Sequence, residues 1–88
     1  MKGKLLITNH IKEYRKAYGY SQEYLAKLTG LSQNSISDIE SGKNGCTLGH
    51  AFLIAQAFGL YIEDVFSWAY VSENNPHNIH VVDGGLHV

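Results

Sequence analysis

Residues 21–43, which read SQEYLAKLTGLSQNSISDIESGK, decide the fold of this chain. Apolar residues recur at helical spacing in two segments, 22–29 and 33–41. Only three residues, Gly30-Leu31-Ser32, join the two segments. So short a connection forces two successive helices to cross sharply, which is the geometry of a helix-turn-helix.

Glycine placement extends this helical rhythm to the rest of the chain. A glycine follows each of four helical segments, where it can end a helix in the left-handed conformation; these are Gly19, Gly30, Gly42 and Gly59. The segments open with residues that cap helices well: Asn9, Ser21, Ser32 and Thr47. We therefore expect helices at about 10–18, 22–29, 33–41, 48–58 and 62–68.

The apolar side chains of these segments predict one hydrophobic core. Its expected members are Ile11, Tyr14, Tyr18, Leu25, Ala26, Leu28, Leu31, Ile36, Ile39, Leu48, Ala51, Phe52, Ile54, Ala55, Phe58, Leu60, Ile62, Val65 and Phe66.

Length and composition indicate a single globular domain. The chain has 88 residues, of which 44% are hydrophobic and 17% charged. Its one cysteine, Cys46, excludes an internal disulfide framework and fits a reducing compartment. The apolar run Leu5-Leu6-Ile7 is too short for the core of a signal peptide, and no later run reaches membrane length. We expect a cytoplasmic protein without a membrane partner.

Charge is distributed unevenly along the chain. Residues 1–43 hold all seven basic residues and four acidic ones, a net charge of +3. Residues 44–88 hold four acidic residues and no Lys or Arg, a net charge of −4. The first half can therefore face phosphate while the second half repels it.

The outward positions of segment 33–41 are unusual for a helix kept only for stability. They are Gln33, Asn34, Ser35, Ser37, Asp38 and Ser41, several of which form helices poorly. Short hydrogen-bonding groups of this kind match the edges of bases in the major groove. The sequence has no nucleophile–base set, phosphate loop or closed metal site, so it predicts a binding protein, not an enzyme, and implies no cofactor.

The stretch quoted above resembles the lambda-repressor/Cro-like (XRE) helix-turn-helix family. The shared pattern is SQ-x-x-LA-x-x-x-G-x-S-x-x-x-I-x-x-x-E-x-G, and the resemblance covers about residues 8–67. It implies an all-α, five-helix domain over 1–67 that binds a double-stranded operator as a homodimer and regulates transcription, in our reading as a repressor. Residues 68–88 would form a C-terminal extension.

The resemblance also implies roles for single residues. Gln33 and Asn34 match the principal base-reading positions, and Ser37 and Asp38 match secondary ones. Gln and Asn pair well with adenine, and segment 33–41 lacks the Arg or Lys that commonly reads guanine, so we expect an A·T-weighted site.

Contacts to the DNA backbone are expected from residues outside that reading face. Gln22 and Lys43 match phosphate-contacting positions of the family. Three further lysines could add contacts, namely Lys12, Lys16 and Lys27, and Lys2 and Lys4 could form an arm along the backbone.

Arg15 and Glu40 match a family pair that forms a partly buried salt bridge between the first and third helices. Departures from the family pattern lie elsewhere. Cys46 stands where proline is usual, Gly49 interrupts the first turn of segment 48–58, and Tyr61 replaces the usual small cap of the last helix. Cys46 and His50 could suggest a reactive thiolate or a metal pair, but two ligands do not close a metal site.

The tail leaves several readings open. Trp68, Tyr70 and Val71 are expected to continue from the last helix over the core or into a dimer contact, and residues 79–88 could form a small hairpin. A metal site or a pH-sensitive interface could arise from His77, His80 and His87, although an unremarkable tail is favoured. The alternative function is an antitoxin-like interaction module whose tail holds a partner protein.

Overall fold

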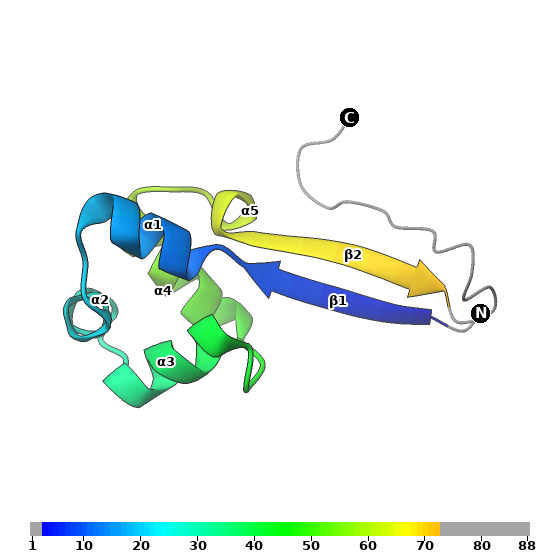
Figure 1. The fold of residues 1–88 in the computed structure, drawn as a ribbon, viewed down its shortest axis with the longest axis horizontal. Helices are drawn as coiled ribbons and strands as arrows, with labels where there is room; N and C mark the ends of the chain where they lie inside the picture. Colours follow the sequence, from blue (N-terminus) through cyan, green and yellow to red (C-terminus); the bar gives the residue numbers. More distant parts are fainter. Residues whose placement is uncertain (1–2, 73–88) are drawn as a thin grey trace.

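The computed structural model describes residues 3–72 as a group of five helices with a two-stranded antiparallel ribbon (Figure 1). In chain order the elements are β1 (Gly3–Asn9), α1 (Ile11–Tyr18), α2 (Gln22–Thr29), α3 (Gln33–Ser41), α4 (Leu48–Phe58), α5 (Ile62–Val65) and β2 (Phe66–Ser72).

The first four helices begin and end where the sequence predicts, within one residue. Side chains of Ser21, Ser32 and Thr47 accept hydrogen bonds from the amides of Tyr24, Ser35 and His50 at 2.9–3.1 Å. The four predicted glycines follow α1 to α4 with positive φ. At Gly42 (φ +77°) this conformation lets the chain leave α3 abruptly, and the Gly42 amide donates to the carbonyl of Ile39 at 3.1 Å.

The core lies between the helices and is smaller than the sequence predicts. Its buried members are Ile11, Leu25, Ala26, Ile36, Ile39, Ala51, Ile54, Ala55, Phe58 and Val65. Four expected core residues are largely exposed instead: Tyr18, Leu28, Leu48 and Phe52. The error at Leu48 and Phe52 has a simple cause, because α4 is apolar around most of its circumference and its periodicity does not single out the buried side.

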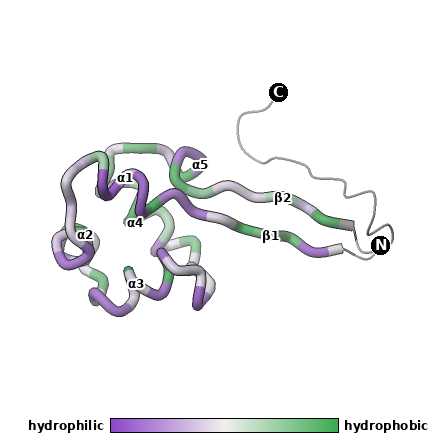
Figure 2. Tube along the Cα trace, viewed as in Figure 1, coloured by the Kyte–Doolittle hydropathy of each residue, from purple (hydrophilic) through white to green (hydrophobic). Residues whose placement is uncertain are grey.

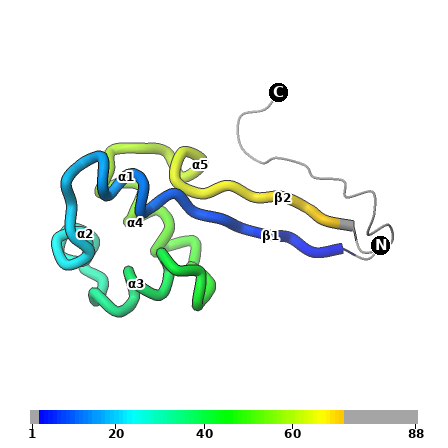
Figure 3. The backbone as a smooth tube through the Cα atoms, viewed as in Figure 1, coloured from blue at the N-terminus to red at the C-terminus, as the bar shows by residue number. Residues whose placement is uncertain are grey.

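The two strands correct the all-α prediction. The helix expected at 62–68 ends at Val65, and the chain continues as β2, which holds Trp68, Tyr70 and Val71. Lys4 lies within β1 and not in a free arm. Strands from opposite ends of the described chain pair in the register Leu5↔Tyr70, Ile7↔Trp68 and Asn9↔Phe66, as the blue and yellow tubes of Figure 3 show.

The ribbon projects from the helical body, within a molecule whose principal extents are 43, 27 and 21 Å (Figure 1). Its base is fixed where the amide of His10 donates to the carbonyl of Val65 at 2.8 Å and the His10 Nε2 lies 3.1 Å from the Ser67 hydroxyl. At the outer end the Tyr70 ring occupies the space that a side chain on Gly3 would need. The domain boundary expected at residue 67 falls inside β2.

Several predictions concern residues outside the described range. They are the hairpin at 79–88, the roles of His77, His80 and His87, and the arm at Lys2. None of the helices in residues 3–72 is both long and apolar enough to span a membrane. Within the same residues, no three His, Cys, Asp or Glu side chains come together as a group that could hold a metal ion.

Candidate nucleic-acid interface

The outward face of α3 carries the predicted base-reading side chains. Asn34, Ser37, Asp38 and Ser41 repeat at the i, i+3, i+4, i+7 spacing of one helix face, and Gln33 borders them at the first helical position. Gln33 and Asn34 are exposed, whereas Ser37 and Asp38 are half-buried. The opposite side of the helix is anchored in the core by Ile36 and Ile39. One helix therefore presents amides and hydroxyls to solvent on a rigidly packed base.

The start of α3 is fixed by local hydrogen bonds. The Ser32 hydroxyl oxygen accepts from the Ser35 amide at 3.0 Å, and the Ser32 and Ser35 hydroxyls lie 2.9 Å apart. The turn before it is held by buried Thr29, whose hydroxyl donates to the carbonyl of Leu25 at 2.9 Å and accepts from the Leu31 amide at 3.3 Å. Gln33 and Asn34 thus project from a helix end whose direction is set by the turn.

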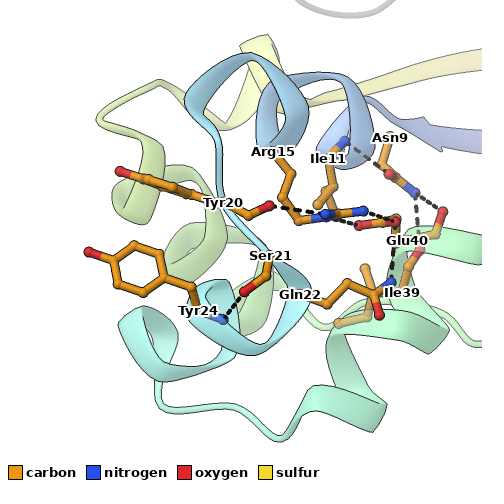
Figure 4. Close-up of polar contacts among 9 residues, drawn as sticks. All are labelled: Asn9, Ile11, Arg15, Tyr20, Ser21, Gln22, Tyr24, Ile39 and Glu40. Carbon is orange, nitrogen blue, oxygen red and sulfur yellow. Dashed lines mark hydrogen bonds and ion pairs between the residues drawn. The ribbon is translucent and has the colours of Figure 1, made fainter.

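An ion pair beneath this face ties α1 to α3 (Figure 4). Arg15 donates twice to the Glu40 carboxylate, from Nε at 3.0 Å and from Nη2 at 3.1 Å. Its Nη1 donates to the carbonyl of Tyr20 at 3.0 Å, which holds the segment between α1 and α2. The side chains of Arg15 and Glu40 are only 15% and 8% exposed. The structure therefore contains the partly buried salt bridge that the resemblance implies, and its contact is bidentate.

Gln22 joins this network from the first turn of α2. Its Nε2 donates to Glu40 Oε1 at 3.3 Å, so the amide predicted to contact DNA also bridges α2 to α3. Burial alone would raise the pKa of the Glu40 carboxyl. The hydrogen bonds and charge of Arg15, with help from the Gln22 amide and the Lys12 charge, reverse that effect and hold the pKa below its ordinary value. Glu40 consequently remains an anion that positions three helices.

Asn9 is a structural residue whose full role the sequence did not reveal. Its Oδ1 accepts from the Ile11 amide at 3.1 Å, but the N-cap position of α1 is occupied by His10 and not, as the sequence predicted, by Asn9. In addition, its Nδ2 donates to the carbonyls of Ile39 and Glu40 at 3.0 and 3.4 Å (Figure 4). These carbonyls belong to the last turn of α3, 30 and 31 residues away. Asn9 therefore joins the ribbon, α1 and the end of α3.

The acid on the reading face is also restrained. Asp38 Oδ2 accepts a hydrogen bond from the Asn44 amide group at 3.2 Å, and the Lys43 amide donates to the Asp38 carbonyl at 3.0 Å. Asp38 therefore fixes the turn after α3, and this turn carries the exposed Lys43.

The remaining predicted backbone contacts are exposed lysines. Lys12 and Lys16 lie one turn apart on α1, and Lys27 lies in the last turn of α2. Lys12 is close enough to Glu40 for its charge to lower the pKa of that carboxyl, so it lies near the Arg15–Glu40 pair. Lys12 thus lies near the same end of α3 as Lys43.

The departures from the family pattern have local consequences only. Burial raises the pKa of the Cys46 thiol, which disfavours the reactive thiolate. Tyr61 offers no short capping side chain to α5. The Asp64 carboxylate instead accepts from the amide of Tyr61 itself at 2.9 Å, which fixes the start of α5 from within its first turn.

Comparison with known proteins agrees with this geometry. A helix-turn-helix family model matches residues 11–65. An uncharacterized HTH-type transcriptional regulator of Methanocaldococcus jannaschii is 47% identical over 58 residues, which cover 66% of this chain and 88% of that protein. The uncharacterized HTH-type transcriptional regulator YgzD of Bacillus subtilis is 40% identical over 58 residues, with the same coverage of 66% and 88%.

A solved structure shares the fold. It is the restriction-modification controller protein C.AhdI of Aeromonas hydrophila, with 31% identity and a TM-score of 0.60 over 61% of this chain and 82% of the other. The model match begins at the first residue of α1 and ends at the last residue of α5, so it contains all five helices and neither strand. With most of its length matched in this way, the chain belongs to the XRE-type helix-turn-helix family.

Proposed function

We propose that this protein regulates transcription by binding a double-stranded DNA operator sequence-specifically, with α3 in the major groove. The observation that carries the proposal is the exposed Gln33 and Asn34 at the start of a helix held in place by the Arg15–Glu40 pair. Helix-turn-helix proteins read bases from this position of the second helix. The names of the relatives, HTH-type transcriptional regulators and a restriction-modification controller, support the same activity.

The individual contacts follow from side-chain chemistry. Gln33 and Asn34 each offer a donor and an acceptor that fit adenine N7 and N6, and Asp38 can accept from cytosine N4. The Ser37 hydroxyl would supply one further base contact from the same face. Lys12, Lys16, Lys27 and Lys43 supply contacts to phosphates, which position the protein but carry no sequence information. The Nε2 group of Gln22 has two N–H donors. One donates to Glu40, and the other would donate to a phosphate.

Binding without catalysis is the mode of action that we propose. A repressor follows most simply, because a protein seated on an operator excludes other proteins from that DNA. A homodimer would place two α3 helices in successive major grooves, about 34–36 Å apart on one side of the duplex. The operator would then be a palindrome with A·T pairs at the positions that Gln33 and Asn34 read.

Selection of bound duplexes from a random DNA pool tests this proposal. The wild-type protein should enrich a palindromic, A·T-containing site at near-physiological salt. The Gln33→Ala/Asn34→Ala variant should lose the enrichment, because it lacks the side chains that contact bases while it keeps those that contact phosphates. Sequence-blind binding by both proteins, or no binding, would overturn the proposal.

Lys43→Ala is the matched control for that experiment. Lys43 is exposed and belongs to no described ion pair or core contact, so its removal leaves the fold and the selected sequence unchanged. It should weaken binding to all duplexes alike and reduce the slope of log K against log salt by about 1, the value for one lost phosphate contact. A change of the selected sequence would instead make Lys43 a base-reading residue.

A further inference from the structure

The more apolar face of the β1–β2 ribbon is one that nothing in residues 3–72 covers. Because side chains alternate along a strand, the register places Leu5, Ile7, Phe66, Trp68 and Tyr70 on the same side, which we call the ribbon face. Leu5 is 55% exposed, Ile7 64% and Trp68 40%. Figure 2 shows a hydrophobic stretch of β1 running outward, away from the helices.

An open apolar groove extends the ribbon face onto the helical body. Ile7 and Phe66 line it from the ribbon, Leu48 from the start of α4 and Ile62 from α5. Leu48 is 68% exposed although it was expected in the core. The exposed apolar side chains of the two regions thus form one continuous surface. Glu63 is the charged residue at its edge, beside Trp68.

We propose that the ribbon face and this groove bind a second copy of the chain, with two ribbons packed face to face and antiparallel about a two-fold axis. This inference deepens the proposed function, since it assigns the surface by which the regulator becomes a dimer. An isolated two-stranded ribbon is marginal in water, and only the base of this one packs against the helices. An occupant that covers Leu5, Ile7 and Trp68 therefore stabilises the ribbon itself.

Charge selects a second copy as that occupant. The ribbon has Glu63 and Asp64 close to its base and Lys4 near its outer end, so a second ribbon in antiparallel orientation matches these charges, whereas a partner of a single charge sign would be repelled at one end. In a two-fold interface the same surface of each copy contacts the other. An uncharged ribbon face can contact its own copy without repulsion between like charges. In the antiparallel arrangement, Lys4 at the outer end of one ribbon comes to the end of the partner that carries Glu63. Because Lys4 lies on the face of β1 opposite to Leu5, its attraction to Glu63 of the second copy would act along the edge of the ribbon.

The size of the ribbon fits the spacing of a palindromic operator. A strand of seven residues is about 23 Å long. Two ribbons that overlap along their length hold the helical bodies at opposite ends, and α3 lies within each body (Figure 1). The distance between the two α3 helices then exceeds the ribbon length by part of each body, which is compatible with about 34–36 Å between half-sites.

Sedimentation equilibrium of the full chain tests the interface with a matched pair of variants. Ile7→Glu places a charge on the ribbon face, and Leu6→Glu places the same charge on the neighbouring residue of the opposite face, which is 43% exposed. The wild type and Leu6→Glu should be dimers. Ile7→Glu should dissociate roughly 100-fold more readily or more, because the change occurs twice in a two-fold interface. Circular dichroism checks that each variant is folded, and Ile7→Ser replaces Ile7→Glu if the charge prevents folding.

Three results would overturn the interface. They are a wild type that stays monomeric on a palindromic duplex, an Ile7→Glu variant as dimeric as Leu6→Glu, and dissociation by Phe52→Glu on α4 in place of Ile7→Glu. DNA reading is scored separately. Gln33→Ala/Asn34→Ala should stay dimeric while it loses base preference, and Ile7→Glu should keep its base preference on a single half-site while it loses cooperative binding to two. If either the dimer interface or base reading by α3 is disproved, the other can therefore still be tested.

Discussion

The helical body and the ribbon are built on different principles. The body, residues 11–65, is held by a partly buried ion pair, polar caps and an apolar core, and the outward face of α3 is polar. The ribbon lies outside the family match, has few ties to the body and exposes Leu5, Ile7 and Trp68. Our two proposals assign different tasks to these regions: the body would position groups for DNA, and the ribbon would supply an apolar surface for assembly.

The largest effect that separates the two regions is expected at Arg15. Arg15→Ala leaves the Glu40 carboxylate buried without its cation, and loss of one member of such a pair costs about 3–5 kcal/mol. Urea unfolding measures the change. The matched control is Lys16→Ala on the exposed side of α1, which should stay within about 0.5 kcal/mol of the wild type. Equal, small effects at both positions would mean that the ion pair does not hold the body together.

The junction between the regions depends on Asn9. Asn9→Ala removes one accepted and two donated hydrogen bonds, and we expect a loss of about 1–2 kcal/mol in the free energy of unfolding. Thr8→Ala changes the preceding, exposed residue and should have little effect. Comparison of the two variants by urea unfolding tests the junction, which would be unimportant if both behaved alike.

Protein concentration distinguishes the ribbon from the body. If the ribbon face is an interface, each tenfold rise in concentration adds up to about 1.4 kcal/mol per dimer, or about 0.7 kcal/mol per chain, to the apparent stability of the wild type, because only the folded chain dimerises. The melting temperature should therefore rise with concentration in the wild type and stay constant in Ile7→Ser. A constant melting temperature in both proteins would leave the ribbon without a partner.

The smallest expected effect is the pH dependence of the Glu40 contribution. Its pKa in the folded state lies below the ordinary value of 4.5, so the anion stabilises the fold above that pH. This stabilisation is lost as the pH falls through the lowered folded-state pKa, where the carboxyl becomes protonated. The stability difference between the wild type and Glu40→Gln should thus be constant near neutral pH and shrink in acid below the ordinary carboxyl pKa of 4.5. A stability difference that grows in acid would contradict a lowered pKa for Glu40 in the folded state.

Sequence reasoning succeeded where local signals repeat. The caps at Ser21, Ser32 and Thr47 and the glycines after each helix are short-range features, and they set the helix bounds correctly. The Arg15–Glu40 pair could be predicted because the resemblance supplied a contact between distant residues. The strands could not be predicted, because β1 and β2 are separated by the whole helical body and neither is stable alone.

The candidate site divides in the same way. The spacing of Asn34, Ser37 and Asp38 on one helix face follows from the sequence. The bonds of Asn9 to the end of α3, of Gln22 to Glu40 and of Asn44 to Asp38 depend on tertiary placement, and no local pattern marks them. Exposed Leu48 was likewise taken for core, because an apolar residue on α4 carries no sign of whether the protein itself or a partner covers it.

The central claim, that α3 reads bases, is tested most directly by pairing a change in the protein with a change in the DNA. The affinities of the wild type and Asn34→Ala are measured on the selected operator and on a duplex in which one A·T pair of the half-site is replaced by G·C. We expect the wild type to lose about 1–3 kcal/mol of binding free energy at the pair that Asn34 reads. Asn34→Ala should then bind both duplexes equally. Equal losses for the two proteins at every A·T pair would contradict base reading by Asn34.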